Sequence, residues 1–187
     1  MEKLESYFES AGFDKTDSGQ IASCFKKRVL KKDDYFVKEG KKCLELGFIE
    51  TGQFQYYSIT NEGDERTTYI SLEDSFVASL LSYLNEIPAR ENIKALTSAI
   101  LWTIKKQDVI ELQAQLPHFK DFYIKLIEWQ ICCIDKSRLD LITLTAEQRY
   151  AKLLNEEPGL IQKVPLQCIA SMLGVTPRHL SRIRNKI

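Results

Sequence analysis

The C-terminal segment Val164–Ile187 constrains the fold of this chain more than any other stretch. Apolar and small residues recur three or four positions apart before Gly174, which indicates a short helix that ends in a turn. Thr176 and Pro177 then supply a helix N-cap and a first helical residue. This succession predicts two short helices that cross at a tight turn, which is the helix-turn-helix arrangement.

The outward face of the second predicted helix is basic. Leu180 and Ile183 take its inward positions, and the segment from Val164 onward contains arginines and a lysine but no Asp or Glu. Arginines near the N-terminal end of such a helix can enter a major groove and reach guanine edges. We therefore predict a DNA-contacting surface, although a basic, solvated terminal helix would show the same pattern. The predicted members of this surface are Thr176, Pro177, Arg178, His179, Ser181, Arg182 and Lys186.

The charge of the chain is balanced overall but unevenly distributed. Its 26 Lys and Arg residues equal its 26 Asp and Glu residues, which excludes a protein that coats nucleic acid by bulk charge. From Leu144 onward seven basic residues oppose three Glu, a net charge of +4, and the preceding 19 basic and 23 acidic residues give −4. A nearly neutral body with a basic C-terminal part suits a protein whose nucleic-acid contact is local.

Cysteine and histidine content predicts neither a metal site nor a cofactor. The five cysteines are odd in number and lack CxxC spacing, so reduced thiols in a cytoplasmic protein are expected. An iron–sulfur cluster needs four grouped cysteines, and His118 is more simply a polar residue at a helix start than a haem ligand. Cys132 or Cys133 could sense oxidants, although a buried structural thiol is the simpler explanation. The mixed-charge N-terminus and the lack of a run of roughly 20 apolar residues predict no signal peptide and no membrane span.

The first part of the chain alternates between β-like segments and short helices. Tyr, Phe, Ile and Thr are enriched between Arg28 and Leu72, and turn residues separate the segments at short intervals. This pattern predicts an antiparallel sandwich or roll, so the expected fold class is α+β. Short helices are expected over residues 4–12, 21–25 and 75–83, and further strands over residues 93–96 and 99–104.

A long helix is expected next. Phe119–Ile142 contains no Gly or Pro, which predicts about six helical turns. Two apolar stripes at helical spacing follow this segment, and a helix that is apolar on two faces needs two packing partners. One partner can be the β domain and the other the same helix of a second subunit, although burial within one monomer is the alternative. The predicted dimer interface comprises Phe119, Phe122, Tyr123, Leu126, Ile127, Trp129 and Ile134.

Three parts are expected along the chain: residues 1–116 as the β-roll, 117–143 as the dimerisation helix and 144–187 as the DNA-binding domain. Thr145 and Gln148 have the spacing of a capping box, so a new helix should start there. Glu157, Pro158 and Gly159 are expected to end that helix.

This order of a β-roll, a long helix and a helix-turn-helix resembles the CRP/FNR family of bacterial transcription regulators, Bacteroidetes-type members in particular. The match is closest over residues 145–187. The resemblance implies a double-stranded β-helix (a jelly-roll-like β-roll of the cyclic-nucleotide-binding type) and two recognition helices on an inverted-repeat promoter. It also implies that Arg182 contacts a base and that Thr176 caps the helix and contacts a phosphate. Pro177 and Arg178 stand where the best-studied members carry Arg and Glu, so the usual half-site is not implied.

The ligand-binding end departs further from the family. In the family, the phosphate-binding cassette carries a Gly-Glu pair before a short helix and an Arg followed by Ser or Thr after that helix. Here no Gly precedes Phe76, and Arg90 is followed by Glu91, whose charge would repel a phosphate. Arg90 is the one candidate for a ligand pocket, and a surface Arg beside Glu91 is its alternative. Control by cAMP is therefore not supported, and no effector is identified.

The predicted function is that of a homodimeric, sequence-specific DNA-binding transcription regulator. The alternative is a ligand-sensing β-roll protein whose C-terminal module binds a protein partner, and steep salt dependence would distinguish DNA binding from it. An enzyme is disfavoured because the chain has two histidines and lacks a Gly-rich phosphate loop, HExxH and GxSxG. An activator would also contact RNA polymerase, and composition does not locate a patch for that contact.

Overall fold

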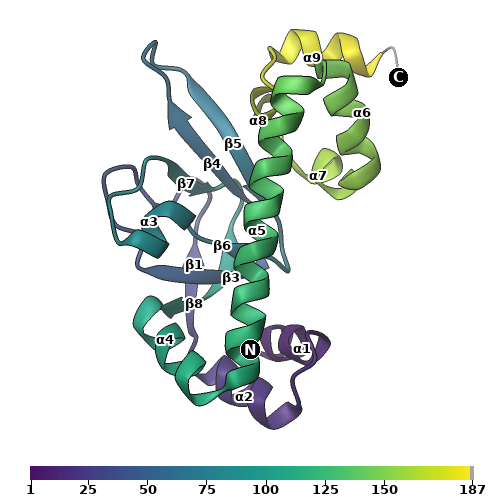
Figure 1. Ribbon diagram of the computed structural model, residues 1–187. Coiled ribbons are helices and arrows are strands. Elements are labelled where there is room, and N and C mark those ends of the chain that lie inside the picture. Colours follow the sequence, from purple (N-terminus) through teal and green to yellow (C-terminus); the bar gives the residue numbers. More distant parts are fainter. Residues whose placement is uncertain (186–187) are drawn as a thin grey trace. The chain divides into compact units, whose positions relative to one another are not determined.

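The computed structural model describes residues 1–185 as an α+β chain (Figure 1). Two compact units form it: residues 1–56 with 70–126, and residues 57–69 with the chain from 127 onward. The strands are β1 (Lys26–Leu30), β2 (Tyr35–Val37), β3 (Glu45–Thr51), β4 (Phe54–Ile59), β5 (Glu65–Ser71), β6 (Phe76–Val77), β7 (Asn92–Ala95) and β8 (Ala99–Lys105). The helices are α1 (Glu2–Ser10), α2 (Lys15–Ser23), α3 (Leu80–Asn85), α4 (Lys106–Gln115), α5 (Pro117–Thr143), α6 (Ala146–Glu156), α7 (Pro158–Lys163), α8 (Leu166–Met172) and α9 (Pro177–Arg184).

The strands make two four-stranded sheets, as the sequence pattern predicted. One has the order β1-β8-β3-β6 and the other β2-β7-β4-β5, so neighbouring strands are mostly distant in sequence. Strand β8 pairs antiparallel with both β1 and β3. Gly47 of β3 lies where a Cβ atom would come within 2.9 Å of Val77 and 3.1 Å of Phe36, so only glycine fits this close approach. The fully buried side chains of the roll include Phe48, Ile49, Phe54, Ile93, Leu101 and Ile104.

The helix expected over residues 75–83 was wrong in its first part. Phe76 and Val77 form strand β6, which pairs with Gly47 and Phe48 of β3, and helix α3 begins only at Leu80. The rings of Phe48 and Phe76 lie 5.5 Å apart. Packing against a strand distant in sequence therefore determined the structure of this segment, and local spacing did not reveal it.

An aromatic cluster joins α1, the residues on either side of α2 and the first turns of α5 within the β-roll unit. Phe8 lies 5.4 Å from Phe122 and 6.3 Å from Phe119, measured between ring centroids. Phe119 is only 3% exposed because its own β-roll unit covers it, which argues against its predicted place in a dimer interface. Phe122 and Tyr123 are half-buried, and Tyr123 interacts with Tyr83 of α3 rather than with solvent alone.

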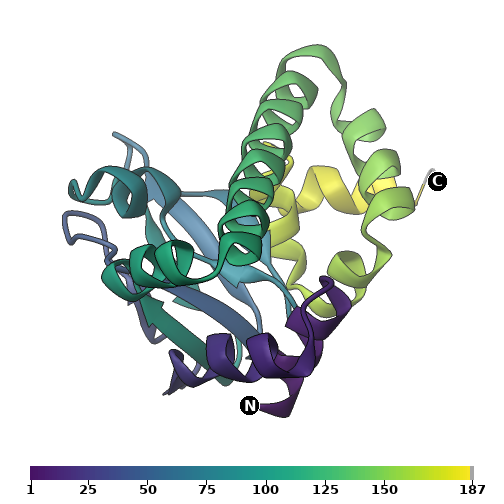
Figure 2. The same ribbon diagram turned by 60° about the horizontal axis from the view of Figure 1, so that its bottom comes forward.

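The second unit contains the later part of α5, helices α6 to α9 and the outer part of the β4–β5 hairpin. Figure 2 shows α6 to α9 grouped beyond the end of α5. The predicted capping box is confirmed, because Gln148 N donates to Thr145 Oγ1 and Thr145 N donates to Gln148 Oε1. Glu157 ends α6 as expected, but Pro158 and Gly159 open α7 rather than a loop, because proline suits a first helical turn. No helix within residues 1–185 is long and apolar enough to cross a membrane.

Candidate nucleic-acid interface

Helices α8 and α9 form the predicted helix-turn-helix, and local contacts fix its turn. Gly174 has φ of +70°, a conformation that glycine adopts without strain. Val175 N donates to the carbonyl of Ala170 at 2.9 Å, which closes the end of α8. Thr176 Oγ1 then accepts from His179 N at 3.2 Å and caps α9, whose first residue is Pro177. The turn and cap predicted from the sequence are thus confirmed.

Packing beneath the two helices holds α9 in place. Ala170, Leu180 and Ile183 are essentially inaccessible to solvent, and the absence of a larger side chain at Ala170 lets the helices approach closely. Arg149 of α6 donates to the carbonyls of Leu144 and Leu173 at 2.5 and 2.7 Å, so it binds the C-terminal end of α8. These contacts leave the opposite face of α9 open to a further partner.

That opposite face carries the residues predicted to bind DNA. Thr176, Pro177, Arg178, His179, Ser181 and Arg182 are all exposed, whereas Lys186 lies outside the described residues. His179 Nε2 lies 3.8 Å from Glu147 Oε1. Within residues 1–185 neither Arg178 nor Arg182 makes an ion pair, so their charges are not neutralised internally. An exposed pair of uncompensated guanidinium groups one helical turn apart suits an anionic partner.

Ser171 of α8 makes a contact that the sequence did not indicate. Its hydroxyl accepts from the backbone N of Thr67 at 2.9 Å and donates to the carbonyl of Glu65 at 3.2 Å. Both partners belong to β5, so one side chain satisfies two backbone groups of that strand. Only the tertiary structure brings these residues together, because they are more than 100 positions apart in sequence.

Tyr69 makes a second link between the hairpin and the helices of this unit. Burial, together with the nearby Glu157 and Cys133, raises the pKa of its phenol to about 12. The same unit therefore contains a hydroxyl that stays protonated through the physiological range. We expect it to serve packing rather than proton transfer.

Comparison with known proteins gives a consistent picture of the architecture. Residues 27–115 match the family model for the cyclic nucleotide-binding domain. FixK2 from Bradyrhizobium japonicum is similar with a TM-score of 0.74 and 16% identity, over 87% of this chain and 83% of that chain. The c-di-GMP responsive global regulator CLP of Xanthomonas campestris gives 0.71 and 15%, over 92% and 91% of the two chains. A transcriptional regulator of the crp/fnr family from Eubacterium rectale gives 0.70 and 18%, over 97% and 87%.

The domain match and the structural similarities cover the β-roll and the helical part together. The chain has the CRP/FNR fold. The resemblance drawn from the sequence is confirmed at this level. No curated protein sequence matches the chain.

In this CRP/FNR fold, the residues at the position of the phosphate-binding cassette do not suit a cyclic phosphate. Ser79, at the start of α3, donates a hydrogen bond from its hydroxyl to Glu91 Oε1 at 3.0 Å. A carboxylate thus lies beside the start of the short helix, where a phosphate would need donors and positive charge. Arg90 is exposed, and the adjacent Glu91 offsets its charge. Arg90 as a ligand residue stays a prediction, and these contacts argue against a phosphate there.

An apolar stripe on α5 is the other notable surface of this chain. Ile124, Ile127, Ile131 and Ile134 recur at alternating spacings of three and four residues, the spacing of a coiled-coil seam, and Leu141 follows seven residues after Ile134. All but the half-buried Ile127 are exposed. Trp129 is 54% exposed but lies at a different helical position. The stripe therefore overlaps the predicted interface at Ile127 and Ile134 and adds three residues to it.

The possible metal ligands and the cysteines among the described residues are the remaining candidates for a functional site. Within residues 1–185 no group of three or more His, Cys, Asp or Glu side chains could hold a metal ion. All five cysteines are free thiols, and Cys132 is the exposed one. Burial raises the pKa of Cys24, Cys43 and Cys133, which keeps these thiols protonated and weakly nucleophilic.

Proposed function

We propose that this protein is a sequence-specific DNA-binding transcription regulator that acts as a homodimer on an inverted repeat. The observation that carries the proposal is the pair Arg178 and Arg182 on the outward face of a capped α9, which is exposed and makes no ion pair within residues 1–185. Such a helix can insert its N-terminal turns into the major groove, where arginine reads the O6 and N7 atoms of guanine.

The apolar stripe of α5 supports the homodimeric form. Coiled-coil seams bury isoleucine and leucine at alternating spacings of three and four residues. Helix α5 supplies four isoleucines at these spacings and a leucine seven residues after the last of them. An exposed apolar stripe of this length is unusual on a monomer. Two copies joined along it would present two recognition helices, which matches the two half-sites of an inverted repeat.

Selection of bound duplexes from a random DNA pool tests the proposal directly. We expect the full-length protein near physiological salt to enrich an inverted repeat with half-sites about one helical turn apart. Binding should weaken steeply with rising salt, since Lys and Arg contacts to phosphate release counterions. Binding without salt dependence, or no enrichment with or without added cell extract, would instead favour a protein partner for this module.

Arg182→Ala tests the role of the recognition helix at one position. We expect a loss of about 1–3 kcal/mol in binding free energy on the selected site, with relaxed specificity at one base pair. Lys120→Ala is the control, because Lys120 is exposed on α5 within the β-roll unit. Equal losses on selected and random duplex would mean that Arg182 contacts only phosphate.

A further inference from the structure

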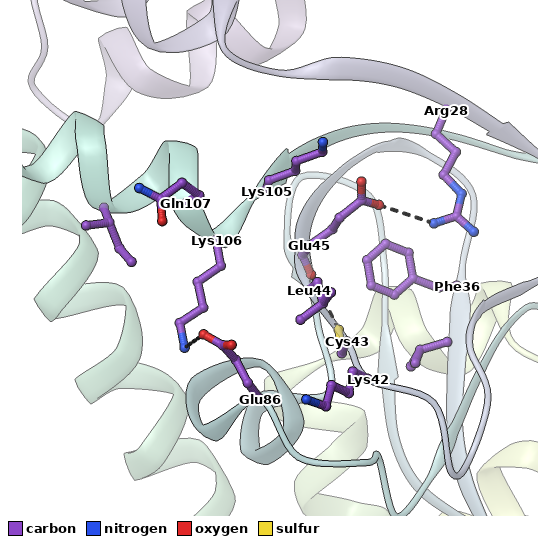
Figure 3. Close-up of a pocket in the computed structure, with 12 residues that line it drawn as sticks. Arg28, Phe36, Lys42, Cys43, Leu44, Glu45, Glu86, Lys105, Lys106 and Gln107 are labelled. Carbon is purple, nitrogen blue, oxygen red and sulfur yellow. Dashed lines mark hydrogen bonds and ion pairs between the residues drawn. The ribbon is translucent and has the colours of Figure 1, made fainter.

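A cavity of about 560 Å³ opens on the β-roll unit (Figure 3). Five separate parts of the chain converge on it: strand β1, strand β2, the segment from Lys42 to Glu45, the residue Glu86 after α3, and the start of α4. Its volume lies within the range of roughly 300–1,000 Å³ that small-molecule sites occupy. None of Ser79, Arg90 and Glu91 lines it, so it is not the cassette position.

The charged lining of the cavity has a positive surplus. Arg28, Lys42, Lys105 and Lys106 oppose only Glu45 and Glu86, which gives four cations against two carboxylates and a net charge of +2. Both carboxylates already have partners: Glu45 lies 3.6 Å from Arg28, and Glu86 lies 2.9 Å from Lys106. Lys42 and Lys105 supply the surplus, and neither makes an ion pair within residues 1–185. An anion entering the cavity would therefore meet a surplus of positive charge without displacing an internal carboxylate.

Two of the four cationic groups of the cavity, those of Arg28 and Lys106, are held in place by contacts within the protein. Arg28 donates to the carbonyl of Tyr35 at 3.1 Å, and its guanidinium carbon lies 5.3 Å from the centroid of the Phe36 ring. Lys106 donates to the carbonyl of Leu84 at 2.8 Å as well as to Glu86. Figure 3 shows Lys106 directed towards Glu86 and Arg28 directed towards Glu45 beside Phe36. Preorganised groups lower the entropy cost of binding.

The remainder of the lining is apolar. Phe36 and Val37 are buried core residues that form part of the wall, whereas Leu44 and Ile110 are 49% and 48% exposed. These two exposed aliphatic side chains come from different elements and meet at one cavity. Burial of their surface by a ligand would be favourable in proportion to the apolar area covered.

We propose that this cavity binds a small amphipathic organic anion: an apolar ring or chain that carries one carboxylate, sulfonate or phosphate group. The apolar part lies against Leu44 and Ile110, and the anionic group binds to the surplus positive charge that Lys42 and Lys105 supply. A fully polar anion would leave the aliphatic wall uncovered, and a neutral apolar molecule would not use the surplus charge. This proposal concerns binding alone and does not depend on the DNA-binding proposal.

Two fluorescent dyes with the same ring system and different charge test the proposal on the full-length protein. 1-Anilinonaphthalene-8-sulfonate carries the anionic group, and N-phenyl-1-naphthylamine lacks it. The double variant Lys42→Gln/Lys105→Gln should raise the dissociation constant of the sulfonate roughly tenfold and leave that of the neutral dye unchanged. The control Lys15→Gln/Lys120→Gln removes the same charge from exposed lysines outside the cavity and should change neither constant.

A second double variant, Leu44→Ser/Ile110→Ser, separates this cavity from other apolar surfaces such as the stripe of α5. It should weaken binding of both dyes roughly fivefold, since both use the aliphatic wall. The proposal is overturned if neither cavity variant affects sulfonate binding, or if the control lysines matter as much as Lys42 and Lys105. Far-ultraviolet circular dichroism and thermal unfolding confirm that each variant is folded, which is expected because all four replaced side chains are exposed.

Discussion

The first turns of α5 and its later turns have similar apolar content but very different surroundings. Phe119 and Phe122 lie within the aromatic cluster of the β-roll unit, whereas Ile131 and Ile134 of the second unit are exposed. One continuous helix thus contributes core residues in its first part and an uncovered apolar stripe in its second. The difference teaches that apolar residues at helical spacing identify a packing surface but do not identify the partner that covers it.

The largest expected effect concerns the buried first turns of α5. Phe119→Ala should lower the free energy of unfolding by about 3–5 kcal/mol, because it removes a 3% exposed ring from a packed cluster. Urea unfolding at low protein concentration measures this change. Trp129→Ala is the matched control from the later turns, and its 54% exposed ring should contribute less than about 1 kcal/mol. Similar losses for both variants would contradict the division of α5 into a buried and an exposed part.

An effect of intermediate size concerns the exposed apolar stripe on the later turns of α5. Ile134→Lys places a charge within the apolar stripe and should weaken self-association roughly hundredfold, because a seam position would bury the ammonium group. Leu139→Lys is the control, since Leu139 is 45% exposed but lies outside the stripe spacing. Sedimentation equilibrium measures both. If the wild-type protein sediments as a monomer at all concentrations, the stripe serves a different partner and the homodimer proposal fails.

The smallest expected effect concerns the link between the hairpin and α8 in the second unit. Ser171→Ala leaves the backbone N of the buried Thr67 without its hydrogen-bond acceptor, which should cost about 1–2 kcal/mol locally. Hydrogen exchange at the Thr67 amide should accelerate accordingly. Ser137→Ala on the exposed surface of α5 is the control and should leave that amide protected. Unchanged exchange in the Ser171 variant would show that the hairpin is held by other contacts, such as those of Tyr69.

Several features could be predicted from the sequence because they depend on nearby residues. The capping box of Thr145 and Gln148, the turn at Gly174 and the cap at Thr176 each involve partners within a few positions. The antiparallel roll followed from local composition and turn spacing. The strand at Phe76 was missed because its structure depends on pairing with Phe48, which lies on a different part of the chain.

The sequence by itself therefore determined the helix-turn-helix, its turn and cap, and the arginines on its outward face, since backbone geometry and periodicity act over a few residues. Only the tertiary structure decided which apolar residues of α5 are covered, that Ser171 bonds to β5, and that Lys42, Lys105, Leu44 and Ile110 share one cavity. These features join residues that are distant in sequence. Their positions depend on the packing of whole elements, which no local pattern specifies.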